Sequence, residues 1–423
     1  MAGGRGTRIA ELFPNIPKPL IPVDGIPILE REIRSLVAQG FKDIILTVGY
    51  MADKIIAYFG DGNKLGVKIE YFVEDTPLGN AGALFRLKDK IGEEPFLLLN
   101  ADAAFDVDFN RMLDFHKQHG GLVTLFTHPN SHPYDSGLII ADENGKVERW
   151  LTKEDERPEW YNNRVNAGLH IIDPKVLDDC LQNLEIDKQT GYPKGKVDLD
   201  RQILKPLCGT GLMFCYDSPE YVKDMGTPER FHQVEADYKN GVVESKNLRH
   251  KQKAIFLDRD GTINKYVGFM RDINDFELIE GVAEAIKQIN QSGYLAIVVT
   301  NQPVIARGDV SWEELHEMHR KMETLLGIKG AYIDGIYICP HHPDKGFEGE
   351  RPEYKIDCDC RKPKPGLLLQ AAKDFNIDLS QSFMIGDSDR DLEAGKNAGV
   401  KESINIEKNA ANGLYNAVLY IVS

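Results

Sequence analysis

Several kinds of sequence feature are missing from this chain of 423 residues. No apolar run approaches the ~20 residues that a membrane-spanning helix needs, and no basic segment followed by an apolar stretch stands at the beginning as in a secretory signal. Positive charge is scarce, because 51 Lys and Arg face 66 Asp and Glu, a formal net charge of −15. That balance disfavours nonspecific binding of nucleic acid. We therefore expect a cytoplasmic protein with no membrane or nucleic-acid partner; its oligomeric state stays open.

Cysteine is also scarce, with six residues in the whole chain. Cys180, Cys208 and Cys215 stand in apolar or turn contexts, where a thiol is usually buried and inert. The other three cluster with histidines between residues 339 and 360. In a reducing compartment this clustering favours a metal site over disulfides.

Apolar strand-like runs alternate with helix-like segments in both halves of the chain, which predicts an α/β fold. Six runs are expected to be buried strands: residues 44–48, 96–99, 122–126, 254–257, 295–300 and 383–386. A polar, weakly patterned stretch separates the two halves. We therefore expect domains at residues 1–240 and 254–423, joined by a linker at residues 241–253.

The first half opens on a glycine-rich loop. Glycines let the backbone come close to a triphosphate, and their amides can donate hydrogen bonds to it. Arg8 adds a forked cation suited to phosphate oxygens, and Lys18 stands rigidly between two prolines. The loop residues expected to bind a nucleotide are Gly3, Gly4, Gly6 and Thr7.

Residues 2 to about 235 resemble the sugar-nucleotidyltransferase family. The opening reads Gly-Gly-x-Gly-Thr-Arg followed by Pro-Lys-Pro, and further family motifs stand at residues 74–84, 99–102, 166–168 and 224–228. The resemblance implies a Rossmann-like domain with a mixed sheet. It also implies that a sugar 1-phosphate attacks the α-phosphorus of a nucleoside triphosphate and releases pyrophosphate. The protein then positions the reactants and neutralises charge.

The same resemblance assigns residues to roles. Arg8 and Lys18 would act on the triphosphate, and Asp102 and Asp224 would hold Mg²⁺, which prefers hard oxygen ligands. Gly79 is expected to contact the base. The residues expected to contact the sugar phosphate are Gly137, Lys153 and Asn166.

This half departs from the family in three places. Relatives usually carry Gly-Asp where this chain has Ala101 and Asp102, and Glu-Lys-Pro where it has residues 151–154. Relatives also place an apolar first strand before the glycine loop, whereas only Met1 and Ala2 stand before it here. We expect the complete protein to begin upstream of Met1, which an intact-mass measurement of the native protein tests.

In the second half, two aspartates follow the expected strand at residues 254–257. Because Asp258 and Asp260 are two positions apart beside a glycine turn, one carboxylate can attack while the other handles protons. The segment resembles the nucleophile motif of the haloacid dehalogenase superfamily. Its later motifs follow in order at residues 300–302, 361–363 and 386–389.

This second resemblance implies a Rossmann-like domain that transfers a phosphoryl group in two steps. Asp258 would attack phosphorus and form an aspartyl-phosphate, while Asp260 would protonate the leaving alcohol and then activate water. Mg²⁺ would be held by Asp258, the Asp260 backbone carbonyl and Asp387. The residues expected to bind phosphate groups are Thr300, Asn301 and Lys362, with Arg361 for a second anionic group.

A metal-ligand pattern precedes the Arg361-Lys362 pair. Cys339 and His341 have one residue between them, as do Cys358 and Cys360. Three thiolates and one imidazole complete a tetrahedral set with no open position for water, which predicts a structural Zn²⁺. The family pattern favours His341 over the adjacent His342.

Within the superfamily, the second half is most similar to heptose 1,7-bisphosphate 7-phosphatases, although histidinol phosphatases share the zinc pattern and Pro303-Val304 replaces the usual Ser-Gly. A heptose bisphosphatase yields the heptose 1-phosphate that a sugar nucleotidyltransferase could consume. We therefore expect a bifunctional enzyme that makes GDP-heptose with GTP, or a related product with another nucleoside triphosphate. Two alternatives stay open. One is a mannose- or glucose-1-phosphate nucleotidyltransferase fused to a histidinol-phosphatase-like enzyme; the other is a phosphatase whose first half only senses a nucleotide.

Overall fold

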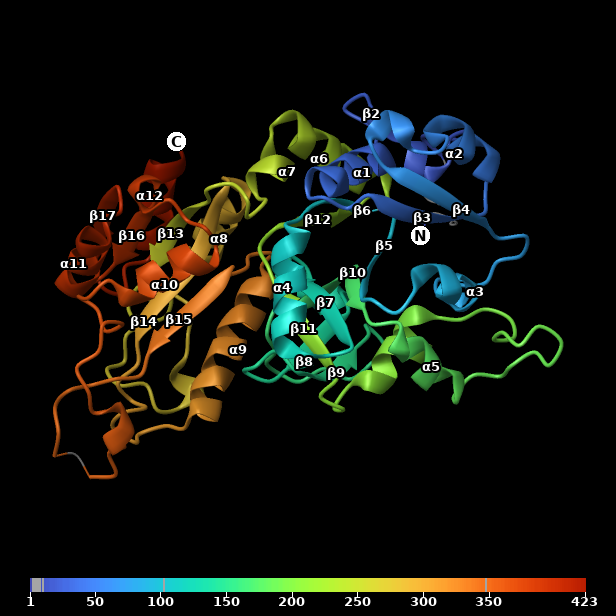
Figure 1. The fold of residues 1–423 in the computed structure, drawn as a ribbon. Helices are drawn as coiled ribbons and strands as arrows, with labels where there is room; N and C mark the ends of the chain where they lie inside the picture. Colours follow the sequence, from blue (N-terminus) through green and yellow to red (C-terminus); the bar gives the residue numbers. More distant parts are fainter. Residues whose placement is uncertain (2–8, 10, 102, 347) are drawn as a thin grey trace. The chain divides into compact units, whose positions relative to one another are not determined.

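The computed structural model describes the chain except for residues 2–8, 10, 102 and 347 (Figure 1). The chain divides into two compact units. The first unit comprises Met1–Thr127, Ile139–Trp150 and Asn166–Asn247; the second comprises His128–Leu138, Leu151–Val165 and Leu248–Ser423. Two segments that precede the predicted linker therefore belong to the second unit. The predicted linker itself contains the short helix α7 (Val242–Ser245) and buried Val243 and Leu248, so it is packed rather than extended.

Most strands of the first unit lie in a six-stranded mixed sheet. Its order is β11-β7-β10-β8-β9, with β5 also paired to β10. The strands are β5 (Phe96–Leu99), β7 (Val123–His128), β8 (Leu138–Ala141), β9 (Val147–Leu151), β10 (Val165–Ile172) and β11 (Met213–Asp217). β11 and β7 are parallel, whereas β10 is antiparallel to β5 and β8. The expected strands at residues 96–99 and 122–126 are confirmed, as is the mixed sheet.

Three two-stranded sheets complete the strands of this unit. They are β1 (Pro22–Val23) with β2 (Ile26–Pro27), β3 (Asp43–Val48) with β4 (Lys68–Val73), and β6 (Ala103–Asp106) with β12 (Tyr221–Asp224). The helices are α1 (Ile28–Ala38), α2 (Ala52–Phe59), α3 (Gly82–Ile91), α4 (Phe109–His119), α5 (Lys175–Leu181) and α6 (Pro228–Lys239). Helix α1 forms because Leu29, Ile33 and Leu36 repeat at helical spacing, and all three are buried.

An apolar cavity of about 350 Å³ lies against β3 and β5, with Met1 in its lining. The Met1 amino group donates a hydrogen bond to Leu99 O at 2.5 Å, and Ala101 N donates one to Met1 O at 3.0 Å. Met1 thus extends alongside the end of β5. Over the described residues β3 and β5 do not pair with each other. The expectation of a start upstream of Met1 stays a prediction.

The second unit contains a five-stranded, fully parallel sheet in the order β15-β14-β13-β16-β17. Its strands are β13 (Lys253–Leu257), β14 (Tyr294–Asn301), β15 (Gly335–Cys339), β16 (Phe383–Gly386) and β17 (Glu402–Asn405). Along β13, Ile255 and Leu257 belong to one core cluster and Ala254 and Phe256 to another. Both faces of the sheet are therefore covered, as parallel sheets require.

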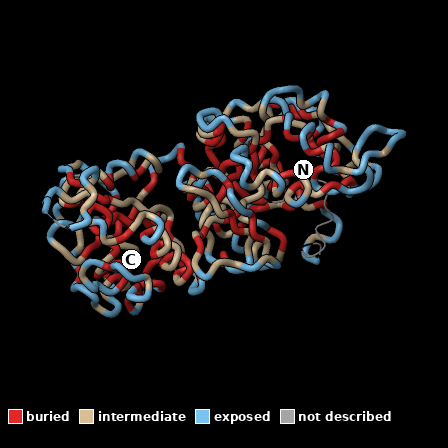
Figure 2. The backbone as a smooth tube through the Cα atoms, turned by 90° about the horizontal axis from the view of Figure 1, so that it is seen from below, coloured by how far each residue is buried: buried red, intermediate tan, exposed pale blue. Residues whose placement is uncertain are grey.

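Helices on the two faces fill these cores. α8 (Val282–Gln291), α9 (Trp312–Ile328) and α12 (Gly413–Val422) contribute to the first cluster, and α10 (Gly366–Asp374) and α11 (Asp389–Ala398) to the second. In Figure 2 buried stretches of the chain run through the interior of each unit, and exposed stretches lie toward its outside. Among the described residues, none of the helices combines the length and apolar character that crossing a bilayer demands.

The segment 151–165, which belongs to the second unit, is hydrogen-bonded to α9. Tyr161 N donates to Thr324 Oγ1 at 2.9 Å, and Thr324 Oγ1 donates back to Tyr161 O at 3.1 Å. Asn162 Nδ2 donates to Glu323 Oε2 at 2.6 Å. Tyr161 and Thr324 are both buried, so this contact is part of the folded core rather than a surface touch.

Candidate active and metal sites

The predicted phosphatase residues meet at one edge of the parallel sheet. Asp258 directly follows β13, Asn301 ends β14 and Asp387 directly follows β16. The carboxyl ends of parallel strands share an edge, where α/β proteins bind ligands. A cavity there is lined by six of the predicted residues, namely Asp258, Asp260, Asn301, Arg361, Lys362 and Asp387.

Lys362 lies between two carboxylates in this cavity. Its Nζ is 2.7 Å from Asp258 Oδ1 and 2.6 Å from Asp391 Oδ1. Burial raises the pKa of Asp258, and the Lys362 ammonium opposes that shift. Burial alone would lower the pKa of Lys362, but the two carboxylates raise it above its usual value. The lysine is therefore a fixed positive charge beside the expected nucleophile.

Asn301 fixes the backbone of this lysine. Asn301 Nδ2 donates to Lys362 O at 3.0 Å, and Lys362 N donates to Asn301 Oδ1 at 3.0 Å. Thr300, the other predicted residue of β14, is buried, and its Oγ1 accepts a hydrogen bond from Gln302 Nε2 at 2.8 Å. Thr300 therefore stands behind the cavity wall rather than in it.

Asp260 is surrounded by donors. Gln302 Nε2 donates to its Oδ2 at 2.7 Å and Asn264 Nδ2 to its Oδ1 at 3.0 Å, and Arg259 bonds to both oxygens. Burial alone would raise the pKa of Asp260, but the Arg259 charge and these hydrogen bonds lower it below its ordinary value. Sequence reasoning missed Gln302 and Asn264, although both stand within a few residues of predicted ones.

Gly261 permits the turn that brings these groups together. Its φ is +91°, and a Cβ at this position would collide with the Asp387 carboxylate. Asp387 Oδ2 is buried and has no hydrogen-bond partner among the described residues, while Lys408 Nζ lies 3.4 Å away. An unsatisfied buried carboxylate oxygen fits a cation ligand.

Asp391 joins Asp258 and Asp387 as a third carboxylate that sequence reasoning missed. One oxygen from each of the three lies within 4.8 Å of the others. Clustered carboxylates are the ligands that Mg²⁺ prefers. The residues present therefore fit a magnesium ion, and the predicted roles of Asp258 and Asp387 as its ligands stay predictions.

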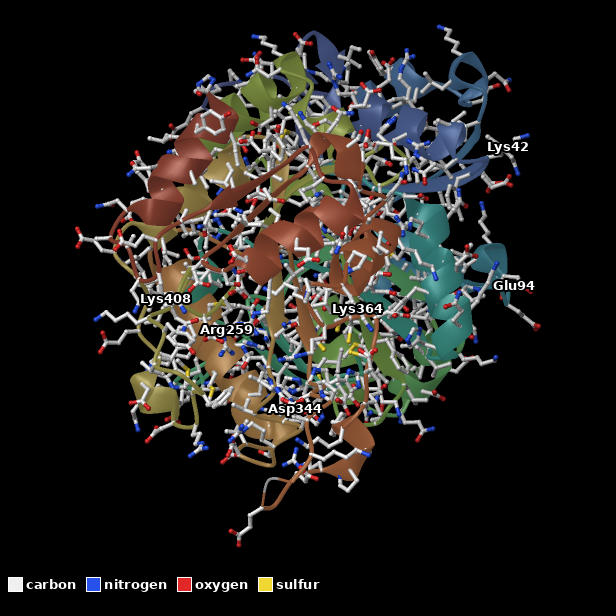
Figure 3. The ribbon with its side chains drawn as sticks, turned by 90° about the vertical axis from the view of Figure 1, so that its left-hand side faces the viewer. Lys42, Glu94, Arg259, Asp344, Lys364 and Lys408 are labelled. Atoms are coloured by element: carbon white, nitrogen blue, oxygen red, sulfur yellow. The ribbon has the colours of Figure 1, made fainter. Side chains whose placement is uncertain are left out.

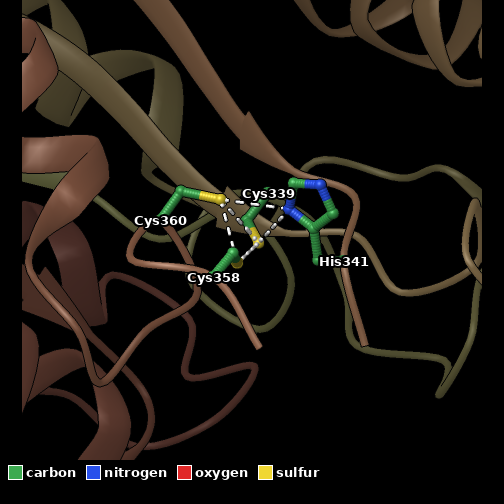
Figure 4. Close-up of side chains that lie close together, drawn as sticks. All are labelled: Cys339, His341, Cys358 and Cys360. Atoms are coloured by element: carbon green, nitrogen blue, oxygen red, sulfur yellow. Dashed lines mark hydrogen bonds between the residues drawn. The ribbon is translucent and has the colours of Figure 1, made fainter. Parts of the chain in front are cut away.

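The predicted zinc ligands also come together (Figure 4). Cys339 Sγ is 3.5 Å from Cys358 Sγ and 3.1 Å from Cys360 Sγ, and the latter two are 3.2 Å apart. His341 Nδ1 lies 3.3 Å from Cys360 Sγ. A tetrahedral zinc site with Zn–S bonds of about 2.3 Å has ligand separations near 3.8 Å, so the set fits with a small expansion.

The competitor His342 faces elsewhere, since its Nδ1 accepts a hydrogen bond from Asp344 N at 3.2 Å. The cluster of three cysteines and His341 is linked to the cavity through Arg361. Arg361 Nη1 donates to His341 O at 3.0 Å, and Arg361 also lines the cavity.

In the first unit the structure brings Lys18 and Asp224 together. Lys18 Nζ is 3.7 Å from Asp224 Oδ1, and Asp224 also pairs with Arg230. Gly79 has φ of +84°, and a Cβ there would lie 2.8 Å from Val197 N, so only glycine fits. Asn166 stands on β10, and its Oδ1 accepts a hydrogen bond from Gly168 N at 3.3 Å.

The other predicted residues of the transferase half either lie outside the described residues or belong to the second unit. Gly3, Gly4, Gly6, Thr7, Arg8 and Asp102 lie outside the described residues. Gly137 and Lys153 belong to the second unit, whereas Gly79 and Asn166 belong to the first.

Comparison with known proteins follows the same division. Residues 1–241 match the nucleotidyl transferase family, and residues 218–399 match haloacid dehalogenase-like hydrolases. The D-glycero-beta-D-manno-heptose-1,7-bisphosphate 7-phosphatase of Pasteurella multocida is 49% identical over 154 residues, 36% of this chain and 80% of the relative.

The mannose-1-phosphate guanylyltransferase of Mycobacterium tuberculosis is 31% identical over 261 residues, 61% of this chain and 69% of the relative. The crystal structure of HddC from Yersinia pseudotuberculosis has a TM-score of 0.47 and 24% identity, covering 56% of this chain and 96% of its own.

Proposed function

We propose two consecutive reactions for this chain, which belongs to the nucleotidyl transferase family in residues 1–241 and to the haloacid dehalogenase-like hydrolase family in residues 218–399. The second region removes the 7-phosphate of D-glycero-D-manno-heptose 1,7-bisphosphate. The first region then transfers a guanylyl group from GTP to heptose 1-phosphate, giving GDP-heptose and pyrophosphate.

Two likenesses support this pairing. The 49% identity to a heptose bisphosphate 7-phosphatase spans 80% of that relative, and the 31% identity to a guanylyltransferase spans 69% of the other. One reaction releases a sugar 1-phosphate and the other consumes a compound of that class. Clustered thiols that bind a metal rather than form disulfides are typical of a reducing compartment, so we place both reactions in the cytoplasm.

The Asp258–Lys362–Asp260 arrangement supports the phosphatase step. An Asp258 oxygen forms a bond to phosphorus as the bond from phosphorus to the sugar oxygen breaks. Asp260, which is ionised in the free protein and takes up a proton from water when the anionic substrate binds, gives that proton to the sugar oxygen. In the second step water loses a proton to Asp260, its oxygen attacks phosphorus, and the bond to Asp258 breaks. The Lys362 ammonium, 2.7 Å from Asp258 Oδ1, offsets the charge of the phosphoryl oxygens.

A magnesium ion held by Asp258, Asp387, Asp391 and the Asp260 carbonyl would supply positive charge where two anions meet. Thr300 and Asn301 position the edge of the sheet at which the phosphate binds. Arg361 binds the phosphate of the substrate that is not transferred. Zinc held by Cys339, His341, Cys358 and Cys360 would order the loop that leads to Arg361 and Lys362.

For the transferase step, Lys18 and Arg8 neutralise the triphosphate. Asp224 and Asp102 would hold a second magnesium ion, and Gly3, Gly4, Gly6 and Thr7 would cradle the phosphates. The close approach of Lys18 to Asp224, 3.7 Å between Nζ and Oδ1, supports a shared site for cation and phosphate. The roles of Gly79 at the base and of Gly137, Lys153 and Asn166 at the sugar phosphate stay predictions from the resemblance.

The test follows phosphate and pyrophosphate together, with heptose 1,7-bisphosphate and a panel of nucleoside triphosphates. Asp258→Asn should abolish phosphate release yet leave pyrophosphate release from added heptose 1-phosphate. Asp224→Asn should do the reverse. Loss of both activities from either change would contradict two independent centres.

The same panel decides between the alternatives. Preference for mannose 1-phosphate as acceptor, or for histidinol phosphate as phosphatase substrate, would favour the runner-up enzyme. Nucleotide binding without pyrophosphate release would favour a sensing first half.

A further inference from the structure

Arg259 stands between the two aspartates of the phosphatase motif and is completely buried, with an exposed fraction of 0%. Figure 3 labels Arg259 among the side chains around it. Its Nη2 donates to Asp260 Oδ1 at 2.8 Å and to Oδ2 at 2.9 Å, and its Nε donates to Oδ1 at 3.1 Å. A guanidinium stays charged in proteins, so burying one is costly unless its donors are satisfied.

The far side of this guanidinium meets His319. Arg259 Nη1 lies 3.1 Å from His319 Nε2, and the imidazole is buried with an exposed fraction of 3%. Because Nη1 can only donate, Nε2 must accept, which requires the neutral imidazole with its proton on Nδ1. Burial lowers the pKa of His319 well below its usual value, in agreement with that neutral form.

His319 is held on a well-anchored helix. Ser311 and Glu314 form a capping box at the beginning of α9, and Met318 and Met322 are buried in the core beneath it. The order of contacts runs from the core, through His319 and Arg259, to the Asp260 carboxylate. Asp260 keeps 20% of its side chain exposed and lines the cavity, so its donors leave one face open.

We propose that Arg259 and His319 are positioning residues that hold the Asp260 carboxylate in the orientation needed for proton transfer. This proposal rests on the proposed phosphatase function. Neither residue gives or takes a proton: the proton on Asp260 passes to the leaving sugar oxygen, and a proton of water later passes to Asp260. Arg259 fixes both carboxylate oxygens from behind, and His319 fixes the guanidinium.

Two substrates with different leaving groups distinguish a positioning role from a merely structural one. A sugar alkoxide needs a proton to leave, whereas p-nitrophenolate leaves without one. The ratio kcat/KM reports the steps up to the formation of the aspartyl-phosphate. A defect in positioning Asp260 therefore lowers kcat/KM for the sugar phosphate much more than for p-nitrophenyl phosphate.

The decisive variants are His319→Leu, which removes the acceptor, and His319→Gln, which keeps an oxygen acceptor. We expect His319→Leu to lower kcat/KM for heptose 1,7-bisphosphate by about tenfold or more, since general acid catalysis typically contributes 10²–10⁴-fold. For p-nitrophenyl phosphate the loss should stay within about threefold, with a burst of nitrophenolate because hydrolysis of the aspartyl-phosphate still needs Asp260. His319→Gln should restore both reactions.

Met322→Leu serves as the matched control, because it changes a buried residue of the same helix and should leave both rates unchanged. Equal losses on the two substrates, or no loss on either, would overturn the proposal. If His319→Leu does not fold, the same comparison of kcat/KM on the two substrates is made with Arg259→Lys. Lysine keeps the positive charge but cannot donate to both carboxylate oxygens as the guanidinium does. A wild-type protein without activity on either substrate would refute the proposed phosphatase function instead.

Discussion

Lys362 permits a test of how burial changes the contribution of an ion pair to stability, because Lys364, two residues later, forms an exposed ion pair with the same nitrogen–oxygen distance. Lys362 Nζ is 2.7 Å from Asp258 Oδ1, and Lys364 Nζ is 2.7 Å from Asp357 Oδ1. The exposed fractions of the side chains are 2% and 13% in the first pair but 41% and 76% in the second. Distance is thus matched, whereas burial differs and Lys362 also pairs with a second carboxylate, Asp391.

Removing Lys362 leaves Asp258 and Asp391 without their shared cation. Loss of one partner of a buried ion pair typically costs about 3–5 kcal/mol, because the remaining charge stays buried. We therefore expect Lys362→Met to lower the free energy of unfolding of the second unit by about 3–5 kcal/mol. Lys364→Met should leave it unchanged, because water screens the exposed pair.

Hydrogen exchange of the β13 and β16 amides measures this effect in the second unit alone, which matters because a chain of two units does not unfold in one transition. Magnesium is left out of the buffer, since a bound cation would replace part of the lost charge. Phosphate release by Lys362→Met should also fall by about 100-fold or more, as with other charge-stabilising groups. Equal exchange rates in the two variants would refute the argument from burial.

Three other measurements probe the remaining structure. Cys358→Ser should reduce the zinc content, measured by atomic absorption, and slow phosphate release while pyrophosphate release persists; full zinc occupancy would contradict the predicted ligand set. Burial lowers the pKa of His170 to about 4. Since the unfolded imidazole titrates near pH 6.5, the first unit should lose up to ~1.4 kcal/mol of stability per pH unit as pH falls from about 6.5 to about 4. His170→Leu should reduce that slope in hydrogen exchange, with the remainder due to His116, whose pKa burial also lowers; an unchanged slope would exclude His170 as a source. Thr324→Val leaves Tyr161 N without its acceptor and should weaken exchange protection at Tyr161 by about 1–3 kcal/mol; unchanged protection would show that this contact contributes nothing.

Much of the phosphatase edge could be predicted from sequence because the motifs stand at strand ends. Asp258 follows β13 and Asp387 follows β16, and the parallel order brings the two ends together. The clustering of the predicted zinc ligands could be anticipated because residue type and spacing indicate a tetrahedral set, with the family pattern favouring His341 over His342. Neither inference required knowledge of how the helices pack.

The pairing of Arg259 with His319 could not be predicted in this way. The two residues are 60 positions apart, and their contact depends on which face α9 turns toward the sheet. The membership of residues 151–165 in the second unit is equally hidden. It depends on hydrogen bonds from Tyr161 and Asn162 to residues of α9 more than 160 positions away, which no local pattern encodes.

Asp391 shows why a functional residue can be concealed by an ordinary structural signal. As the third residue of α11 it completes a capping box: its Oδ2 accepts hydrogen bonds from Ser388 N at 3.1 Å and from Ser388 Oγ at 2.6 Å. A serine followed three residues later by an acidic residue is typical of a helix N-terminus, so the sequence explains Asp391 as a capping residue and gives no reason to expect another role. The other oxygen, Oδ1, pairs with Lys362 at 2.6 Å, which only the fold reveals. A Cβ on Gly386 would collide with the Asp391 side chain. The end of β16 and the first turn of α11 can therefore come close enough to place Asp391 beside Lys362 only because residue 386 is glycine.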